Sequence, residues 1–152
     1  MSNEIKFEDL KFPDDIVRYS ATNEWVCSFR DAVEIGITDY AQAAMRGFMR
    51  DEHLQSIFVD GSLKVGDEVE VGDVIGEVHS SKTTSDIYTP LSGTVIGING
   101  TKQHGVYLIP VADVENDPYG KGYLIRIRPN NEADEDELLS AKEYMLQCKD
   151  AH

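Results

Sequence analysis

Cysteine is scarce in this sequence of 152 residues: Cys27 and Cys148 are far apart, and neither belongs to a CxxC pair. Two isolated cysteines provide neither a disulfide framework nor a cysteine-based metal motif, and they indicate a reducing compartment. Long hydrophobic runs are also missing, since no segment approaches the roughly 18–20 apolar residues of a membrane-spanning helix. The N-terminal segment is polar and acidic, which argues against a secretory or mitochondrial presequence. We therefore expect a cytoplasmic protein without a membrane partner.

Positively charged residues are few as well. Fourteen Lys and Arg residues stand against 28 Asp and Glu residues, which gives a formal net charge of −14. A nucleic-acid backbone would be repelled by this field, so we expect no nucleic acid among the partners. The charge either keeps a small protein in solution or steers it toward partners with basic docking surfaces.

The sequence also lacks the patterns of catalytic and metal-binding sites. His53 and His104 have no companions at metal-ligand spacing, so we expect no metal site. The glycine-containing run VGDEVEVGDVIG lacks the Gly-Lys-Ser/Thr ending of a phosphate-binding loop. Nothing resembles a catalytic triad. The sequence therefore predicts a protein that is not itself an enzyme.

Short stretches rich in β-forming residues follow one another along most of the chain. Short strands at such close spacing favour a barrel or sandwich over a parallel sheet. Asp67, Asp73 and Asp86 each adjoin a glycine or a hydroxyl residue, which predicts that they stabilise turns. The expected strands are residues 25–29, 32–37, 57–59, 67–71, 73–79, 86–90, 93–98 and 122–129.

Helices are expected at two places. The first begins at Thr38 or Asp39 and runs to residue 54. The second begins in the acidic stretch 131–137, where carboxylates favour a helix N-terminus. The apolar faces are expected to contain Ala41, Ala44, Met45 and Phe48 in the first helix and Leu138, Leu139, Met145 and Leu146 in the second. The chain then divides into an extended N-terminal lead-in (1–18), a β-rich domain (19–130) and a C-terminal helix (131–152) packed on that domain.

The two cysteines are expected to differ in exposure. Cys27 alternates with apolar residues in a strand, which predicts a small buried side chain. Cys148 lies near the C-terminus and is expected to be exposed.

Lys82 lies midway between two similar halves of sequence. GDEVEVGDVIGEVHSS precedes it and TTSDIYTPLSGTVIGI follows it, and each half contains two short strands joined by a turn with glycine. The residues next to Lys82 carry small hydroxyl side chains, which can satisfy the backbone of a tight turn. We therefore expect Lys82 at the exposed tip of a hairpin.

Several motifs resemble those of the glycine-cleavage H-protein family, in the order that the family has them. They cover roughly residues 19–146, and NEWV resembles the family's HEWV. The motifs are GITDYAQ (36–42), VGDEVEVGD (65–73), SDIYTPLSGTV (85–95), IN (98–99) and DPYGKGYL (117–124). The resemblance implies a mainly β fold, the barrel-sandwich hybrid of lipoyl and biotinyl carriers, with flanking helices. Residues 19–130 would then be the lipoyl-carrier domain.

The resemblance also implies a cofactor and a set of partners. Lipoic acid would be joined by an amide bond to Lys82 after modification by lipoate-attaching enzymes. The arm would accept an aminomethyl group from a glycine decarboxylase, pass it to an aminomethyltransferase and be reoxidised by dihydrolipoyl dehydrogenase. A carrier that visits several enzymes needs a free tip, so we expect a monomer.

Departures from the family pattern keep other functions open. His79 replaces the family's glutamate three positions before the lysine, Glu115 replaces an asparagine, Tyr123 replaces a tryptophan, and residues 45–56 are several residues longer. One alternative is an H-like lipoate-binding protein of bacterial sulfur oxidation, serving a heterodisulfide-reductase-like complex. Another is an unmodified interaction or regulatory protein on the same fold. Biotin is disfavoured because Lys82 lacks the flanking methionines of biotin carriers.

Overall fold

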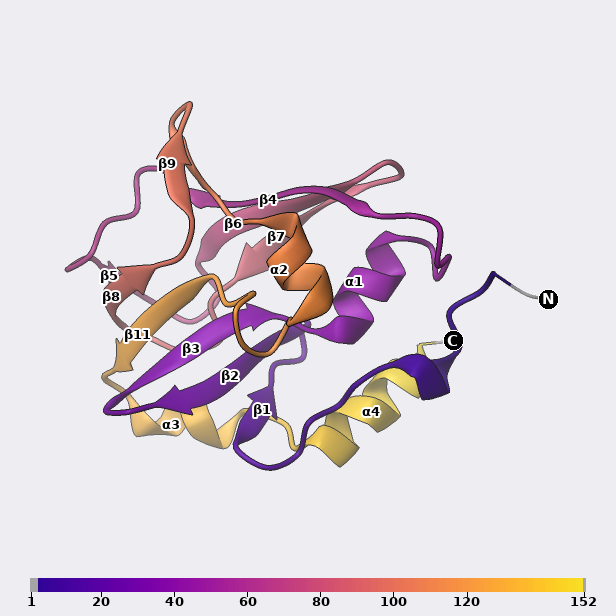
Figure 1. Ribbon diagram of the computed structural model, residues 1–152. Coiled ribbons are helices and arrows are strands. Elements are labelled where there is room, and N and C mark those ends of the chain that lie inside the picture. Colours follow the sequence, from indigo (N-terminus) through magenta and orange to yellow (C-terminus); the bar gives the residue numbers. More distant parts are fainter. Residues whose placement is uncertain (1–2, 152) are drawn as a thin grey trace.

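The computed structural model describes residues 3–151 and contains two antiparallel β-sheets that face each other, with short helices around them (Figure 1). One sheet has the order β1-β2-β3-β11-β8-β5, and the other has the order β7-β6-β4-β10-β9. The expected mainly β, two-layered fold with flanking helices is therefore confirmed. The strands are β1 (Val17–Tyr19), β2 (Glu24–Phe29), β3 (Ala32–Ile37), β4 (Leu54–Asp60), β5 (Glu68–Val69), β6 (Val74–Ser80), β7 (Thr84–Tyr88), β8 (Gly93–Ile98), β9 (Thr101–Gln103), β10 (Val106–Leu108) and β11 (Ile125–Pro129).

The helical elements lie at the edges of the sheets. In the described residues, 3–151, none of them is long and apolar enough to span a bilayer. They are a 3₁₀ turn (Phe7–Asp9), α1 (Asp39–Met45), α2 (Val111–Asn116), α3 (Glu132–Asp136) and α4 (Ala141–Asp150).

The hairpin β2–β3 forms where the sequence predicts it. Most of its residues are buried, and Trp25 pairs with Gly36 across the ladder. A Cβ atom at Gly36 would lie 2.7 Å from the Trp25 ring, so the glycine provides the space that this fully buried indole occupies. The pairing shows why a glycine interrupts an otherwise apolar strand.

Two hydrophobic clusters hold the molecule together. The larger one lies between the sheets and includes Ile35, Ile57, Val78 and Ile127. The smaller one is aromatic, and its members come from the N-terminal segment, β1, β2, α1 and α4. Within it the rings of Tyr19 and Tyr144 stack with centroids 4.7 Å apart and planes 4° apart. The N-terminal segment and helix α4 are thereby packed against the sheet that contains β1 and β2.

Helix α1 differs from its prediction in length and orientation. Thr38 caps it as expected, because its side chain accepts a hydrogen bond from the backbone N–H of Ala41. The helix ends at Met45 rather than near residue 54, since Gly47 and Phe48 both have positive φ values, 63° and 59°. Successive residues in the left-handed region cannot continue a right-handed helix.

The predicted apolar faces of both helices are only partly right. In α1 the buried residues are Tyr40, Gln42, Ala43 and Met45, while Ala44 is exposed. The expected single C-terminal helix is divided into α3 and α4, because Leu139 between them pairs with Tyr19 of β1.

The C-terminal helix also buries different residues from those expected. Helix α4 buries Ala141, Tyr144 and Cys148, whereas Leu146 is 52% exposed. The predicted exposure of Cys148 is wrong, because it is buried in the aromatic cluster; Cys27, predicted to be buried, is half-buried on β2 against the same cluster. Burial raises the pKa of the Cys148 thiol to about 11. Strands β1, β9 and β10 and helix α2 were not expected from the sequence.

Candidate functional site

The β6–β7 hairpin places Lys82 at its tip, as the sequence predicts. Val78 pairs with Ser85 and His79 pairs with Thr84. The turn between the strands is closed by a 2.9 Å hydrogen bond from the Ser80 N–H to the Thr83 carbonyl.

The hydroxyl group of Ser80 completes this turn. Its oxygen accepts hydrogen bonds from the backbone N–H groups of Lys82 and Thr83, both at 3.2 Å. The backbone around the lysine is therefore held by the turn's own residues, and Lys82 itself is exposed.

The lysine side chain lies across the end of helix α1 rather than pointing away from the molecule. A Cβ atom built on Gly47 would lie 2.6 Å from the Lys82 Nζ. Beside it, the Ser81 hydroxyl donates a 3.2 Å hydrogen bond to Glu52 Oε2. The segment that follows α1 thus lies against the lysine turn.

His79, which replaces an acidic residue of the family pattern, is engaged on both ring nitrogens. Nε2 lies 3.1 Å from Glu77 Oε1, and Nδ1 lies 3.2 Å from the Thr84 hydroxyl. Its ring packs against Phe58, with centroids 5.5 Å apart. These contacts hold the imidazole along the hairpin, so a role as a base for Lys82 gains no support from the geometry.

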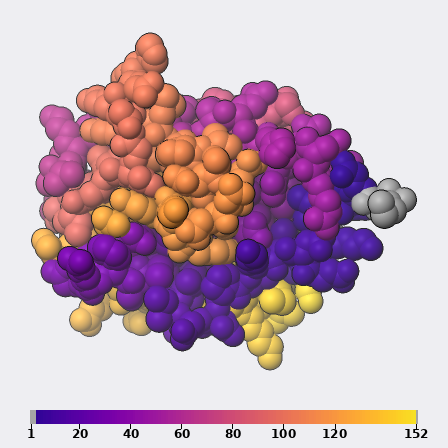
Figure 2. All heavy atoms as spheres, viewed as in Figure 1, coloured from indigo at the N-terminus to yellow at the C-terminus, as the bar shows by residue number. Residues whose placement is uncertain are grey.

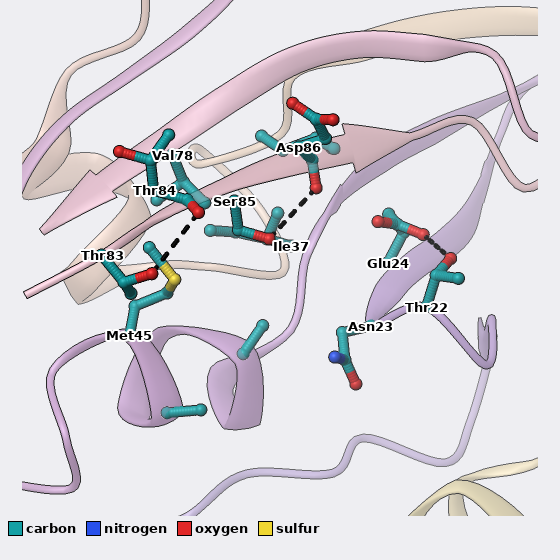
Figure 3. Close-up of a pocket in the computed structure, with 13 residues that line it drawn as sticks. Thr22, Asn23, Glu24, Ile37, Met45, Val78, Thr83, Thr84, Ser85 and Asp86 are labelled. Atoms are coloured by element: carbon teal, nitrogen blue, oxygen red, sulfur yellow. Dashed lines mark hydrogen bonds between the residues drawn. The ribbon is translucent and has the colours of Figure 1, made fainter.

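A cavity of about 340 Å³ opens beside the hairpin, between α1, the start of β2 and strand β7. Figure 3 shows Met45 on the helix side, Glu24 with Thr22 on another side, and Asp86 on the strand. The position of Asp86 within β7 corrects the expectation of a turn role for it. Asp67 and Asp73 do stabilise turns, as predicted, by accepting hydrogen bonds from the backbone N–H groups of Lys64 and Glu70.

Glu24 is a candidate functional residue that was not predicted from the sequence. Its side chain is 2% exposed, and Oε1 accepts hydrogen bonds from the Ser20 hydroxyl at 2.8 Å and from the Thr22 hydroxyl. Oε2 accepts a 3.2 Å hydrogen bond from the Tyr88 N–H. Desolvation raises the pKa of the carboxyl group, and these hydrogen bonds oppose the rise. The only signal in the sequence was a charged residue at the start of an apolar strand.

Glu115, another departure from the family pattern, ties α2 to the segment after α1. Its carboxylate lies 3.6 Å from Arg46 Nη1 and 3.3 Å from His53 Nδ1, and it accepts a 3.2 Å hydrogen bond from the Leu54 N–H. Arg46 and Glu115 side chains are each only 15% exposed, so this pair is screened less than a surface ion pair. Glu115 therefore fixes both ends of residues 46–54.

Comparison with known proteins identifies the family of the chain. A family model described as "Glycine cleavage H-protein" matches residues 17–151. The chain belongs to the glycine cleavage H-protein family. Members of this family are carriers without catalytic activity of their own, and they bear lipoic acid covalently on a lysine. The resemblance seen in the motifs and the expectation of a non-enzymatic carrier are both confirmed.

Individual relatives agree with the family match. The chain is 39% identical over 128 residues to a glycine cleavage system H protein of Acinetobacter baumannii, covering 84% of this chain and 92% of that protein. It is 38% identical over 132 residues to one of Carboxydothermus hydrogenoformans, covering 87% and 90%. The crystal structure of a glycine cleavage system H protein from Mycobacterium marinum superimposes with a TM-score of 0.60 at 28% identity, over 87% of this chain and 95% of the other.

Proposed function

We propose that Lys82 bears the lipoyl group of this carrier, joined by an amide bond to Nζ. The supporting observation is its place at the tip of a hairpin whose backbone hydrogen bonds are satisfied by Ser80 and Thr83. A rigid turn with an exposed lysine suits a long swinging arm, because the arm can move while its anchor stays fixed. When bound, lipoate supplies a dithiolane ring that opens and closes reversibly.

We further propose that the carried group is the aminomethyl group of glycine cleavage. The observation that carries this proposal is the cavity beside the lysine hairpin, which has the buried Glu24 among its lining residues. An aminomethyl group has an amine that is protonated near pH 7, and carboxylates attract such a cation. Desolvation by burial raises the pKa of the Glu24 carboxyl group, and a cationic amine in the cavity would favour its charged form. A negatively charged sulfur species would meet repulsion in the same cavity.

The partners follow from this function. They are the lipoate-attaching enzymes, the glycine decarboxylase, the aminomethyltransferase and dihydrolipoyl dehydrogenase, and we place the carrier in the cytoplasm as a monomer. The net charge of −14 favours partners with basic docking surfaces.

Attachment is tested by the intact mass of the protein purified from its native source. We expect one added lipoyl group, lost in Lys82→Arg and retained in Lys102→Arg, which changes a lysine of strand β9. An unmodified native protein in cells with competent lipoylating enzymes would contradict the proposal and favour the unmodified interaction protein.

The cargo is tested with the lipoylated chain, glycine and a pyridoxal-phosphate glycine decarboxylase. We expect the mass of an added aminomethyl group, in smaller yield for Glu24→Gln and at wild-type yield for the turn variant Asp67→Asn. Sulfur oxidation is the second candidate, and the departures around the hairpin (His79, Glu115 and the longer segment after α1) favour it. It would be supported by loading from a persulfide donor and no loading from glycine.

A further inference from the structure

Two parts of this chain that depart from the family pattern pack against each other. The N-terminal residues precede the family match, which begins at residue 17, and residues 46–53 belong to the longer segment after α1. The Ile5 N–H donates a 2.7 Å hydrogen bond to the Phe48 carbonyl, and the Arg50 N–H donates a 2.9 Å hydrogen bond to the Asn3 carbonyl. Figure 2 shows the indigo N-terminal residues beside the purple segment at one end of the molecule. We call this pair of segments the N-terminal brace.

The brace includes Gly47, and the Lys82 side chain lies against this glycine. Gly47 has a φ of 63°, and a Cβ atom on it would lie 2.6 Å from Lys82 Nζ, 3.5 Å from Cδ and 3.6 Å from Cε. The last atoms of the lysine therefore cross the face of the glycine. A side chain at position 47 would move the amine, the far end of a flexible side chain, away from this place.

Residue 47 is itself fixed from several directions. Its N–H donates a 3.0 Å hydrogen bond to the Ala44 carbonyl, and the Phe48 N–H donates a 2.8 Å hydrogen bond to the Ala43 carbonyl. Further along the same segment, Glu52 accepts the hydrogen bond from Ser81. The segment thus contacts the lysine turn at two neighbouring residues, Ser81 and Lys82.

We propose that Gly47 is a positioning residue for the modification of Lys82, and that the N-terminal brace holds it in place. This inference rests on the proposed attachment at Lys82. The absence of a side chain at position 47 lets the lysine lie along a defined surface, so the modifying enzyme meets the amine in one orientation. The brace lies beside the lysine turn, so an enzyme that modifies Lys82 must also accept this surface.

The chemical step explains why orientation matters. Nζ attacks the acyl carbon of an activated lipoate, such as an acyl adenylate; the C–N bond forms, the bond from carbon to the phosphate oxygen breaks, and the amine loses its proton. No oxidation or reduction occurs. Small displacements of a reacting atom cost large factors in rate. A side chain at position 47 should therefore lower kcat, while KM, which reflects docking over a wider surface, should change little.

The test compares four full-length, unmodified proteins with a lipoate ligase, lipoate and ATP, following the mass of the product. Gly47→Ala adds both a Cβ atom and backbone strain. Gly47→Asn keeps the added atoms but relieves strain, because asparagine tolerates the left-handed region. Gly105→Ala is the control, since Gly105 has a φ of 83° and nothing within 4 Å of its Cβ position.

We expect kcat to fall about tenfold in both Gly47 variants, with KM within about twofold of wild type, and no change in Gly105→Ala. Reductive methylation of Lys82 by formaldehyde with a borohydride as the hydride donor should proceed at the wild-type rate, because small reagents need no particular orientation. Wild-type kcat in Gly47→Asn would overturn the inference, since backbone strain alone would then explain Gly47→Ala. A wild-type chain that is not modified at Lys82 would instead overturn the proposed function.

Discussion

The turn that bears Lys82 and the segment that lies against it are held in opposite ways. The turn, residues 80–83, is closed by hydrogen bonds among Ser80, Lys82 and Thr83. The segment 46–53 is held by residues far away in sequence, such as Ile5 and Glu115. The hydrogen bonds of the turn are local, whereas the contacts of the segment depend on the tertiary fold. The difference teaches that the turn is fixed by its own residues, whereas the segment beside it is fixed by residues that the fold brings together.

The largest expected effect comes from weakening the brace. Ile5 is buried at 8% exposure and donates its N–H to Phe48. Ile5→Ala should lower the free energy of unfolding by about 2 kcal/mol, the lower end for truncating a buried isoleucine. Urea unfolding measures this loss.

Hydrogen exchange then shows which backbone amides lose protection in this variant. The amide of Arg50, which bonds to Asn3, should exchange faster in Ile5→Ala, while the amides of Lys82 and Thr83 should keep their wild-type rates. Faster exchange at the lysine turn as well would show that the two regions are not independent.

A smaller loss of stability is expected from a change in the lysine turn. Ser80→Ala removes the oxygen that accepts two backbone N–H groups, which should cost about 1 kcal/mol. Exchange at Lys82 and Thr83 should speed up, and exchange at Arg50 should not. Ser28→Ala, at an exposed position of β2, is the matched control and should leave both the stability and the turn amides unchanged.

The smallest effect is expected from the ion pair between Arg50 and Asp9, which lies within the brace. Both side chains are partly exposed, at 51% and 32%. Solvent therefore screens the pair, and Asp9→Asn should cost less than about 0.5 kcal/mol. The loss should disappear at high salt. An effect that persists in salt would mean that Asp9 acts through its other contact, the hydrogen bond from the Lys6 N–H.

The same contrast explains what could be predicted from the sequence. The lysine hairpin, the β2–β3 hairpin and the two-layered fold follow from strand patterns and turn residues, which act over short distances. The motifs around Lys82 predict the family from the sequence alone, without tertiary contacts. These features are readable because each depends on neighbours in the chain.

The features that could not be predicted depend on distant partners. Helix α1 stops at Met45 because Gly47 and Phe48 turn left-handed, and the Phe48 carbonyl accepts a hydrogen bond from the N-terminal segment. Cys148 is buried because α4 packs on an aromatic cluster whose members come from both ends of the chain. Glu24 joins the cavity only when β2 and β7 come together. The local signals, a glycine at position 47 and a charged residue at the start of β2, are too weak to predict these features.

The contact between Lys82 and Gly47 is the point where the two regions meet, and NMR of the full-length, unmodified protein tests it most directly. We predict a nuclear Overhauser effect between the Cε protons of Lys82 and the Cα protons of Gly47, with restricted motion of the lysine side chain. The effect should weaken in Ile5→Ala. Its absence in the wild-type protein, with a lysine side chain as mobile as that of the exposed Lys102, would contradict the account.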